Sequence, residues 1–118
     1  MWIKNSLNQQ DAPIHHICTD KNCISTVNGG PWTPRFEKIF NGAGLSFRDA
    51  ANKVKVAGHQ GPHPKEYHQY VYDQLSRRTR GLSPNTPEYR RAVESTLERI
   101  GKEAQTPGTQ VNKWLTKE

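Results

Sequence analysis

The sequence lacks long apolar runs and is poor in hydrophobic residues, and this shortage excludes a membrane-embedded protein. Hydrophobic residues make up 32% of the 118 residues, and the mean hydropathy is −0.94. No stretch approaches the roughly 20 apolar residues that a membrane-spanning helix needs. The first residues also lack the apolar core of a signal peptide. We therefore expect no membrane segment, and we expect any export signal to lie elsewhere in a larger parent protein.

Cysteine is also scarce, because the chain has only Cys18 and Cys23. Two cysteines cannot form a disulfide framework, and there is no second pair for a four-thiolate zinc site. They could form a local disulfide in an oxidising compartment, but we expect two free thiols. Two catalytic motifs are absent as well. The lack of HExxH argues against a zincin protease, and the lack of HxE with PCxxC argues against a nucleobase deaminase.

The length supports one domain, which buries only about two thirds of its unfolded surface. We expect a polar lead-in over residues 1–12 and a single domain over 13–118, with its core at about 13–80 and a helical extension at about 83–118. A bound metal would help to stabilise so thin a core.

Apolar spacing and breaker residues predict an α+β fold. Short β-rich segments predict strands at 14–18 and 52–56, and residues 47–51 suggest one helical turn. The 3.6-residue period predicts a helix from Pro34 to about Ala43, capped by Thr33, and further helices at about 64–78 and 87–104. A last short helix would place Val111, Trp114 and Leu115 on the core.

The net charge of +6 and the pI near 9.6 favour polyanionic partners, although charge alone also promotes solubility. Arg77, Arg78 and Arg80 gather at the end of the second helix. They could contact phosphates, or they could simply be favoured at a helix C-terminus. The arginines and glutamates of the 87–104 helix predict a solvated face with i,i+4 pairs.

The five histidines fall in two places, and this is the sharpest signal in the sequence. His15 and His16 are adjacent on the first strand, and His59, His63 and His68 span the entry to the second helix. Neighbouring side chains on a strand face opposite sides, so the pair cannot enter one pocket unless the strand ends or kinks there. One of the two could bind a metal while the other faces a substrate.

Such histidines suit phosphodiester hydrolysis. That reaction needs a cation to stabilise charge on the phosphate and a base to activate water. Imidazole is mostly neutral near pH 7 and can accept a proton, and it binds zinc, nickel and other first-row ions.

Three segments together resemble the AHH family of polymorphic toxin nucleases, in the HNH/endonuclease VII (His-Me finger) superfamily. The segments are residues 14–17, 45–52 and 58–68, and the resemblance covers roughly residues 12–80. It implies a ββα-metal fold, with the histidine pair on the first strand and the last metal ligands at the helix.

The resemblance also implies roles for individual residues. His16 would be the general base, His15, His59 and His63 would be the metal ligands, and Asn52 would orient the base or its strand. His68 is an alternative ligand or a structural histidine, and Asn52 could merely cap a turn. Ile14 departs from the family, which has Ala or Gly before the pair.

We therefore expect a metal-dependent endonuclease toxin that cleaves DNA rather than RNA, with one divalent ion such as zinc, magnesium, nickel or manganese. Family members usually end large secreted proteins such as Rhs effectors, act in the target-cell cytoplasm and have a cognate immunity protein, which the +6 charge predicts to be acidic. Two alternatives stay open. One is a structural zinc module that binds nucleic acid without cleaving it, and the other is a metal-independent RNase that uses two histidines as acid and base.

Overall fold

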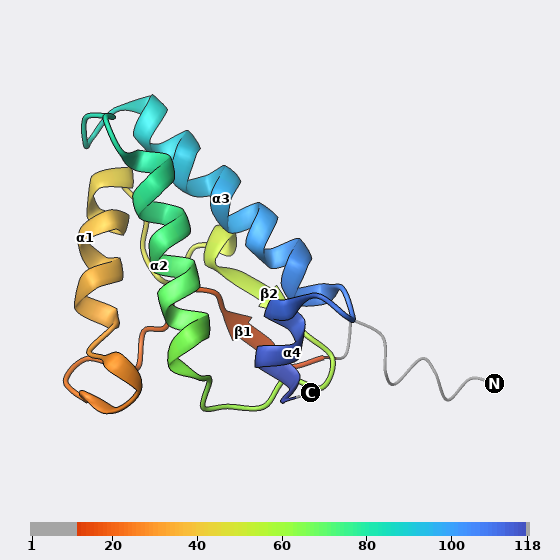
Figure 1. Cartoon of the computed structure of the whole chain (residues 1–118). Helices are drawn as coiled ribbons and strands as arrows, with labels where there is room; N and C mark the ends of the chain where they lie inside the picture. Colours follow the sequence, from red (N-terminus) through yellow and green to blue (C-terminus); the bar gives the residue numbers. More distant parts are fainter. Residues whose placement is uncertain (1–11, 118) are drawn as a thin grey trace.

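The computed structural model describes residues 12–117, which form an α+β fold of one small sheet and four α-helices (Figure 1). The α+β class predicted from the sequence is confirmed. The predicted lead-in lies almost entirely outside the described residues, so its boundary stays a prediction. None of the helices within residues 12–117 combines the length and the apolar character that crossing a membrane would require.

The sheet has two antiparallel strands, β1 (Ile14–His16) and β2 (Lys53–Lys55). His15 lies opposite Val54 and His16 opposite Lys53. Both strands are shorter than predicted. Regular strand pairing stops after His16, and Asn52 holds the next two residues instead. Its backbone oxygen accepts a hydrogen bond from the Ile17 amide (2.8 Å), and its side-chain oxygen accepts one from the Cys18 amide (2.7 Å). Residues Ala50–Asn52 form a 3₁₀ turn, η4, so the partner strand starts only at Lys53.

Helix α1 (Thr33–Ala43) forms where it was predicted, but its cap is different. The N-cap residue is Trp32, and Thr33 is the first helical residue. The Thr33 hydroxyl instead accepts from the Asn22 amide (2.9 Å) and donates to the Thr19 carbonyl (2.8 Å). The predicted Thr33 cap is therefore wrong, because a tertiary contact uses that hydroxyl to hold the loop after β1. A second 3₁₀ turn, η3 (Val27–Gly29), precedes the helix.

The other three helices confirm the periodicity prediction. They are α2 (Lys65–Thr79), α3 (Pro87–Gln105) and α4 (Gln110–Thr116). The hydroxyls of Thr86 and Thr109 cap α3 and α4 by accepting from the amides of Tyr89 and Asn112. Such a cap contributes about 1 kcal/mol. The expected i,i+4 ion pairs of α3 are also present, as Arg90–Glu94 and Arg99–Glu103.

The core draws on every helix and on the end of β1. Helix α3 packs against α1, α2, α4 and β2. The largest fully buried side chains are Trp32, Tyr67, Phe36, Phe40, Ile17, Leu75, Leu97, Ile100, Leu115, Val56, Val71 and Val93. Each fully buried Leu, Ile, Val or Phe side chain contributes about 1.5–3 kcal/mol. The hydrophobic core is therefore formed mainly by side chains from the helices, and the histidine cluster is not part of it.

Both cysteines are free, as expected. Cys18 is buried and Cys23 is exposed.

Candidate metal centre and active site

The imidazoles of His15, His59 and His63 converge where α2 begins. His15 comes from β1, and the other two come from the loop between β2 and α2. His15 Nδ1 lies 3.1 Å from His59 Nε2, which lies 2.9 Å from His63 Nε2. The three candidate ligand atoms all lie within 4.8 Å of one another. The structure thus brings together the three residues that the sequence predicted as a metal set.

Backbone hydrogen bonds hold the loop that carries His59 and His63. The Val56 amide donates to the Pro13 carbonyl (3.1 Å), which fixes the loop to the start of β1. The Gln60 amide donates to the Leu115 carbonyl (2.9 Å), which fixes it to α4. Because these bonds anchor the loop at two points, His59 and His63 are positioned without regular secondary structure.

Tyr67 determines which nitrogen of His15 faces the cluster. The Tyr67 hydroxyl donates its only proton to the Ile17 carbonyl, at 2.7 Å. It must therefore accept from His15 Nε2, which is also 2.7 Å away. A neutral imidazole with its proton on Nε2 presents a lone pair at Nδ1. That lone pair points at the other two histidines.

The arrangement of the three nitrogens suits binding of a metal ion better than hydrogen bonding among the histidines. Because His15 Nδ1 carries a lone pair, a hydrogen bond between His15 and His59 requires the proton to be on His59 Nε2. With that proton in place, His59 Nε2 has no lone pair to accept a hydrogen bond from His63 Nε2. If His63 donates instead, two lone pairs face each other across the His15–His59 contact. A transition-metal ion held by His15, His59 and His63 would accept all three lone pairs together. The donor chemistry therefore fits a bound transition-metal ion.

Burial also keeps these imidazoles in the neutral form that binds metals. Burial, with the charges of His63 and His59 adding, lowers the pKa of His15 to about 2. Burial first, and then neighbouring charges that include His59, His68 and Lys117, lowers the pKa of His63 to about 4. The pKa of His59 is lowered by burial alone. At pH 7 all three therefore offer lone pairs without first releasing a proton.

His16 lies next to this cluster but not in it. Because side chains alternate along β1, its imidazole points to the opposite face of the sheet from His15. It is the last residue of the strand, its side chain is 30% exposed, and Nε2 lies 4.0 Å from an Asp20 carboxylate oxygen. A partly exposed imidazole at a strand end can accept a proton from solvent or a substrate.

Asn52 is fully buried and holds the strand rather than a histidine. Its amide nitrogen donates to the carbonyls of Cys18 (3.0 Å) and Phe47 (3.2 Å), and its amide oxygen accepts from the Cys18 amide. These bonds fix the chain two residues after His16. Its described contacts are thus to the chain that continues β1 and to the turn before η4, and none of them is to a histidine.

His68 does not join the other three histidines. Its ring centre is 6.4 Å from that of His63, and its ring stacks on Trp32 at 5.6 Å. Burial lowers its pKa to about 4. The contacts of His68 match the structural alternative rather than the ligand alternative.

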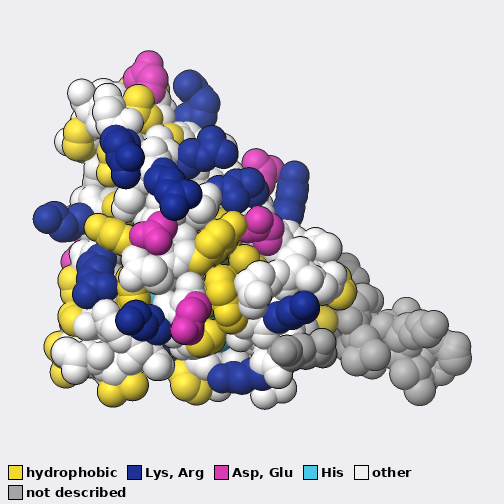
Figure 2. All heavy atoms as spheres, viewed as in Figure 1, with side chains coloured by type: hydrophobic (Ala, Val, Ile, Leu, Met, Phe, Trp, Pro, Cys, Tyr) yellow, Lys and Arg dark blue, Asp and Glu magenta, His cyan; other side chains and the backbone are white. Residues whose placement is uncertain are grey.

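Arg77, Arg78 and Arg80 lie at the other end of α2 from the histidines. The helix has 15 residues, so its two ends are roughly 20 Å apart. Figure 2 shows Lys and Arg side chains gathered over that end of α2 and along α3. A phosphate bound there would lie far from the cluster, so these arginines could contact only a distant part of a long substrate.

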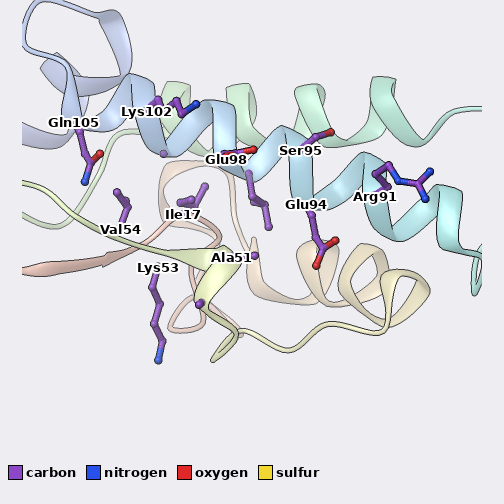
Figure 3. A pocket seen from close by; sticks show the side chains of 13 residues that line it. Ile17, Ala51, Lys53, Val54, Arg91, Glu94, Ser95, Glu98, Lys102 and Gln105 are labelled. Carbon is purple, nitrogen blue, oxygen red and sulfur yellow. The ribbon is translucent and has the colours of Figure 1, made fainter.

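A hollow of about 610 Å³ lies between α3 and β2, and it contains none of the histidines (Figure 3). Ile17, Ala51 and Val54 form its floor, while charged side chains of both signs from α3 line its rim. Despite its size, this hollow is not the candidate active site, because the histidines suited to catalysis lie outside it.

Tyr67 is not among the functional residues predicted from the sequence, and its bond to His15 is visible only in the structure. One signal was present. Tyr67 follows His63 by four residues, which places the two one helical turn apart at the start of α2.

Comparison with protein families adds the decisive observation. Residues 1–104 match the model of AHH, a nuclease family of the HNH/ENDO VII superfamily with conserved AHH. The chain belongs to the AHH nuclease family. Comparisons with curated proteins and with solved structures gave no match.

The AHH assignment agrees with the structure around the histidine pair. His15-His16 is the only adjacent pair of histidines in the sequence, and Ile14 stands where the AHH motif has alanine. The Ile14 side chain is 56% exposed, so the larger residue is accommodated at the surface. The AHH match ends at residue 104, which leaves α4 outside it.

Proposed function

We propose that this AHH-family chain is a metal-dependent endonuclease that hydrolyses phosphodiester bonds of DNA. His15, His59 and His63 hold one divalent ion, and His16 is the general base. The observation that carries the proposal is the set of three neutral imidazole nitrogens whose two short contacts cannot both be two-centre hydrogen bonds. Membership of a nuclease family supports the same reading.

The donor set favours zinc or nickel over magnesium, because magnesium prefers oxygen ligands and imidazole suits the later first-row ions. When bound, such an ion supplies Lewis-acid stabilisation of the negative charge that develops on the scissile phosphate.

The chain's own residues would supply the base and hold it in place. His16 accepts a proton from the attacking water, for which its partial exposure leaves room. Asn52 fixes the backbone after His16 through the bonds to Cys18. Lys53 lies opposite His16 in the strand register and on the same face of the sheet, where its charge favours an incoming phosphate.

The role as a toxin belongs to the same proposal. Its support is the resemblance to polymorphic toxin nucleases, and the net charge of +6 suits both a nucleic-acid substrate and an acidic immunity protein. Expression of the chain in a bacterial cytoplasm should arrest growth with loss of DNA, and expression of a His16→Ala chain should not.

A chelator-controlled cleavage assay tests the proposed activity. Purified protein is incubated with plasmid DNA and, separately, with structured RNA, in EDTA or with added zinc, nickel or magnesium. We expect DNA cleavage that EDTA abolishes, added metal restores, and His16→Ala lowers by at least about 100-fold, the lower end of the range for a lost general base. RNA cleavage that persists in EDTA would instead support the metal-independent RNase.

A further inference from the structure

A second hollow, of about 350 Å³, opens beside His63 between the loop before α2 and helix α4. The Lys117 ammonium donates to the Pro62 carbonyl, and the Gln60 amide donates to the Leu115 carbonyl. These two bonds join the wall formed by α4 to the loop that carries the candidate ligands. Figure 1 shows that loop running past α4 before it enters α2.

Trp114 is the aromatic residue of this hollow. Its ring contacts Tyr67 at an interplanar angle of 72° and Tyr70 at 56°, so neither ring is stacked parallel to the indole. The side chain stays partly exposed and lines the hollow. A partly exposed indole with no parallel-stacked partner among the described residues offers a surface on which a flat ligand can stack.

Two lysines from α4 and its C-cap complete the hollow. Lys113 and Lys117 are exposed and line it together with Trp114 and His63, and within residues 12–117 no acidic side chain lines it. The hollow beside α3 differs, because Glu94 and Glu98 offset two of its three basic residues, Lys53, Arg91 and Lys102. The hollow beside His63 therefore has a net positive charge, which attracts an anion.

We propose that this hollow binds one unpaired nucleotide of the substrate strand, next to the phosphate that is cleaved. The base stacks on Trp114, and the flanking phosphates lie against Lys113 and Lys117. The inference rests on the proposed function, since His63 is common to the metal set and the hollow. Helix α4, which supplies Lys113 and Trp114, lies beyond the residues that match the family model.

The combination of an aromatic ring with lysines favours an unpaired nucleotide over a base pair. In a duplex the faces of each base are covered by its neighbours, whereas a base in a single strand can stack on an aromatic side chain. Lysines alone would contact the backbone of either form. The effect of Trp114 is therefore specific to single-stranded substrate.

The lysines are tested by binding of a fluorescein-labelled single-stranded oligodeoxynucleotide in EDTA, which prevents cleavage. The test variant is Lys113→Met/Lys117→Met, and the matched control is Lys38→Met/Arg91→Met. The control removes two exposed charges from α1 and α3. We expect the test variant to flatten the dependence of log K on log salt by about 0.7 for each lysine, the value for single strands, and to weaken binding at least about 10-fold. Equal binding by the test and control variants would overturn the proposal.

Trp114 is tested with two substitutions, Trp114→Leu and Trp114→Phe. Leucine fills the site without a ring, whereas phenylalanine restores a stacking surface. We expect Trp114→Leu to weaken single-strand binding by about 5-fold or more, the effect of losing one base–aromatic stack, and Trp114→Phe to recover part of it. Binding of a duplex of the same sequence should change less than 2-fold for both. Equal losses on duplex and single strand, or no loss on either, would contradict the base-stacking role.

The binding experiment and the cleavage assay test the two proposals independently, so either proposal can be overturned while the other stands. If the test variants lose binding but the wild-type chain cleaves nothing with any metal, the subsite stands as a nucleic-acid site and the proposed nuclease activity falls. If the wild-type chain cleaves with metal and the variants bind as the controls do, the nuclease stands and the subsite falls. Circular dichroism melts of all variants show whether a loss reflects unfolding.

Discussion

The Tyr67 hydroxyl lies 2.7 Å from both the Ile17 carbonyl oxygen and Nε2 of His15. One hydroxyl proton serves the carbonyl, so His15 must donate from Nε2 and present Nδ1 to the other histidines. Tyr67 is thus a positioning residue that acts through His15.

Replacing Tyr67 with phenylalanine should weaken metal binding while the fold is kept. The variant removes the bond that selects the His15 tautomer, and the loss of such an outer-shell partner typically costs 10- to 100-fold in affinity. Calorimetric titration with zinc or nickel measures the change. Tyr70→Phe is the matched control, because its hydroxyl bonds to Glu103 instead. Equal metal affinities for the two variants would rule out the positioning role.

Replacing Asn52 with alanine should destabilise the fold strongly. It leaves the buried amide and carbonyl of Cys18 without partners, and each unsatisfied buried group costs about 1–3 kcal/mol. Urea unfolding should show a loss of about 2–6 kcal/mol on this basis. A loss below the error of the linear extrapolation would show that Asn52 does not hold the end of β1.

The metal-free protein should lose stability as the pH falls below about 6.5, the ordinary histidine value. Burial lowers the pKa values of His15, His63 and His68 in the folded state, to about 2 for His15 and about 4 for the other two. Between those values and 6.5 the unfolded chain binds more protons, so stability rises with pH in this window. Thermal melts in EDTA from pH 4 to pH 8 measure the slope.

His68→Gln provides the internal control for that pH dependence. It removes one buried imidazole that lies outside the three-histidine cluster, so the slope between pH 4 and 6.5 should become shallower. An unchanged slope would mean that His68 does not contribute.

Metal removal should lower the melting temperature without unfolding the chain. The core of Phe36, Val71, Leu97 and Ile100 comes from α1, α2 and α3 and contains no candidate ligand. Far-ultraviolet circular dichroism in EDTA should therefore keep its helical signal. A random-coil spectrum on chelation would support the structural zinc module instead.

The helices could be predicted from the sequence because their apolar spacing agrees with their final packing. Val93, Leu97, Ile100 and Ala104 recur at helical intervals, and all four are buried. The Thr33 cap could not be predicted correctly, because the hydroxyl is used by residues 11 and 14 positions earlier in the chain. A local capping pattern does not reveal a partner brought in by folding.

The site was predictable to a similar degree. The resemblance to the AHH family grouped His59 and His63 with His15, and the structure brings the three together. The role of Tyr67 depends on the contact between its hydroxyl and the carbonyl of Ile17, which lies 50 positions earlier in the chain. The separation of Arg77 from the cluster was predictable, because the helix expected at about 64–78 has histidines at its start and arginines at its end. The direction of side chains such as Tyr67 across the fold was the missing information.

Anomalous diffraction from a crystal grown with zinc or nickel tests the central claim most directly. We predict one strong peak bonded to His15 Nδ1, His59 Nε2 and His63 Nε2, at about 2.0–2.1 Å from each nitrogen. A peak coordinated by His68 in place of one of these ligands, or no peak between the three nitrogens at saturating metal, would contradict it.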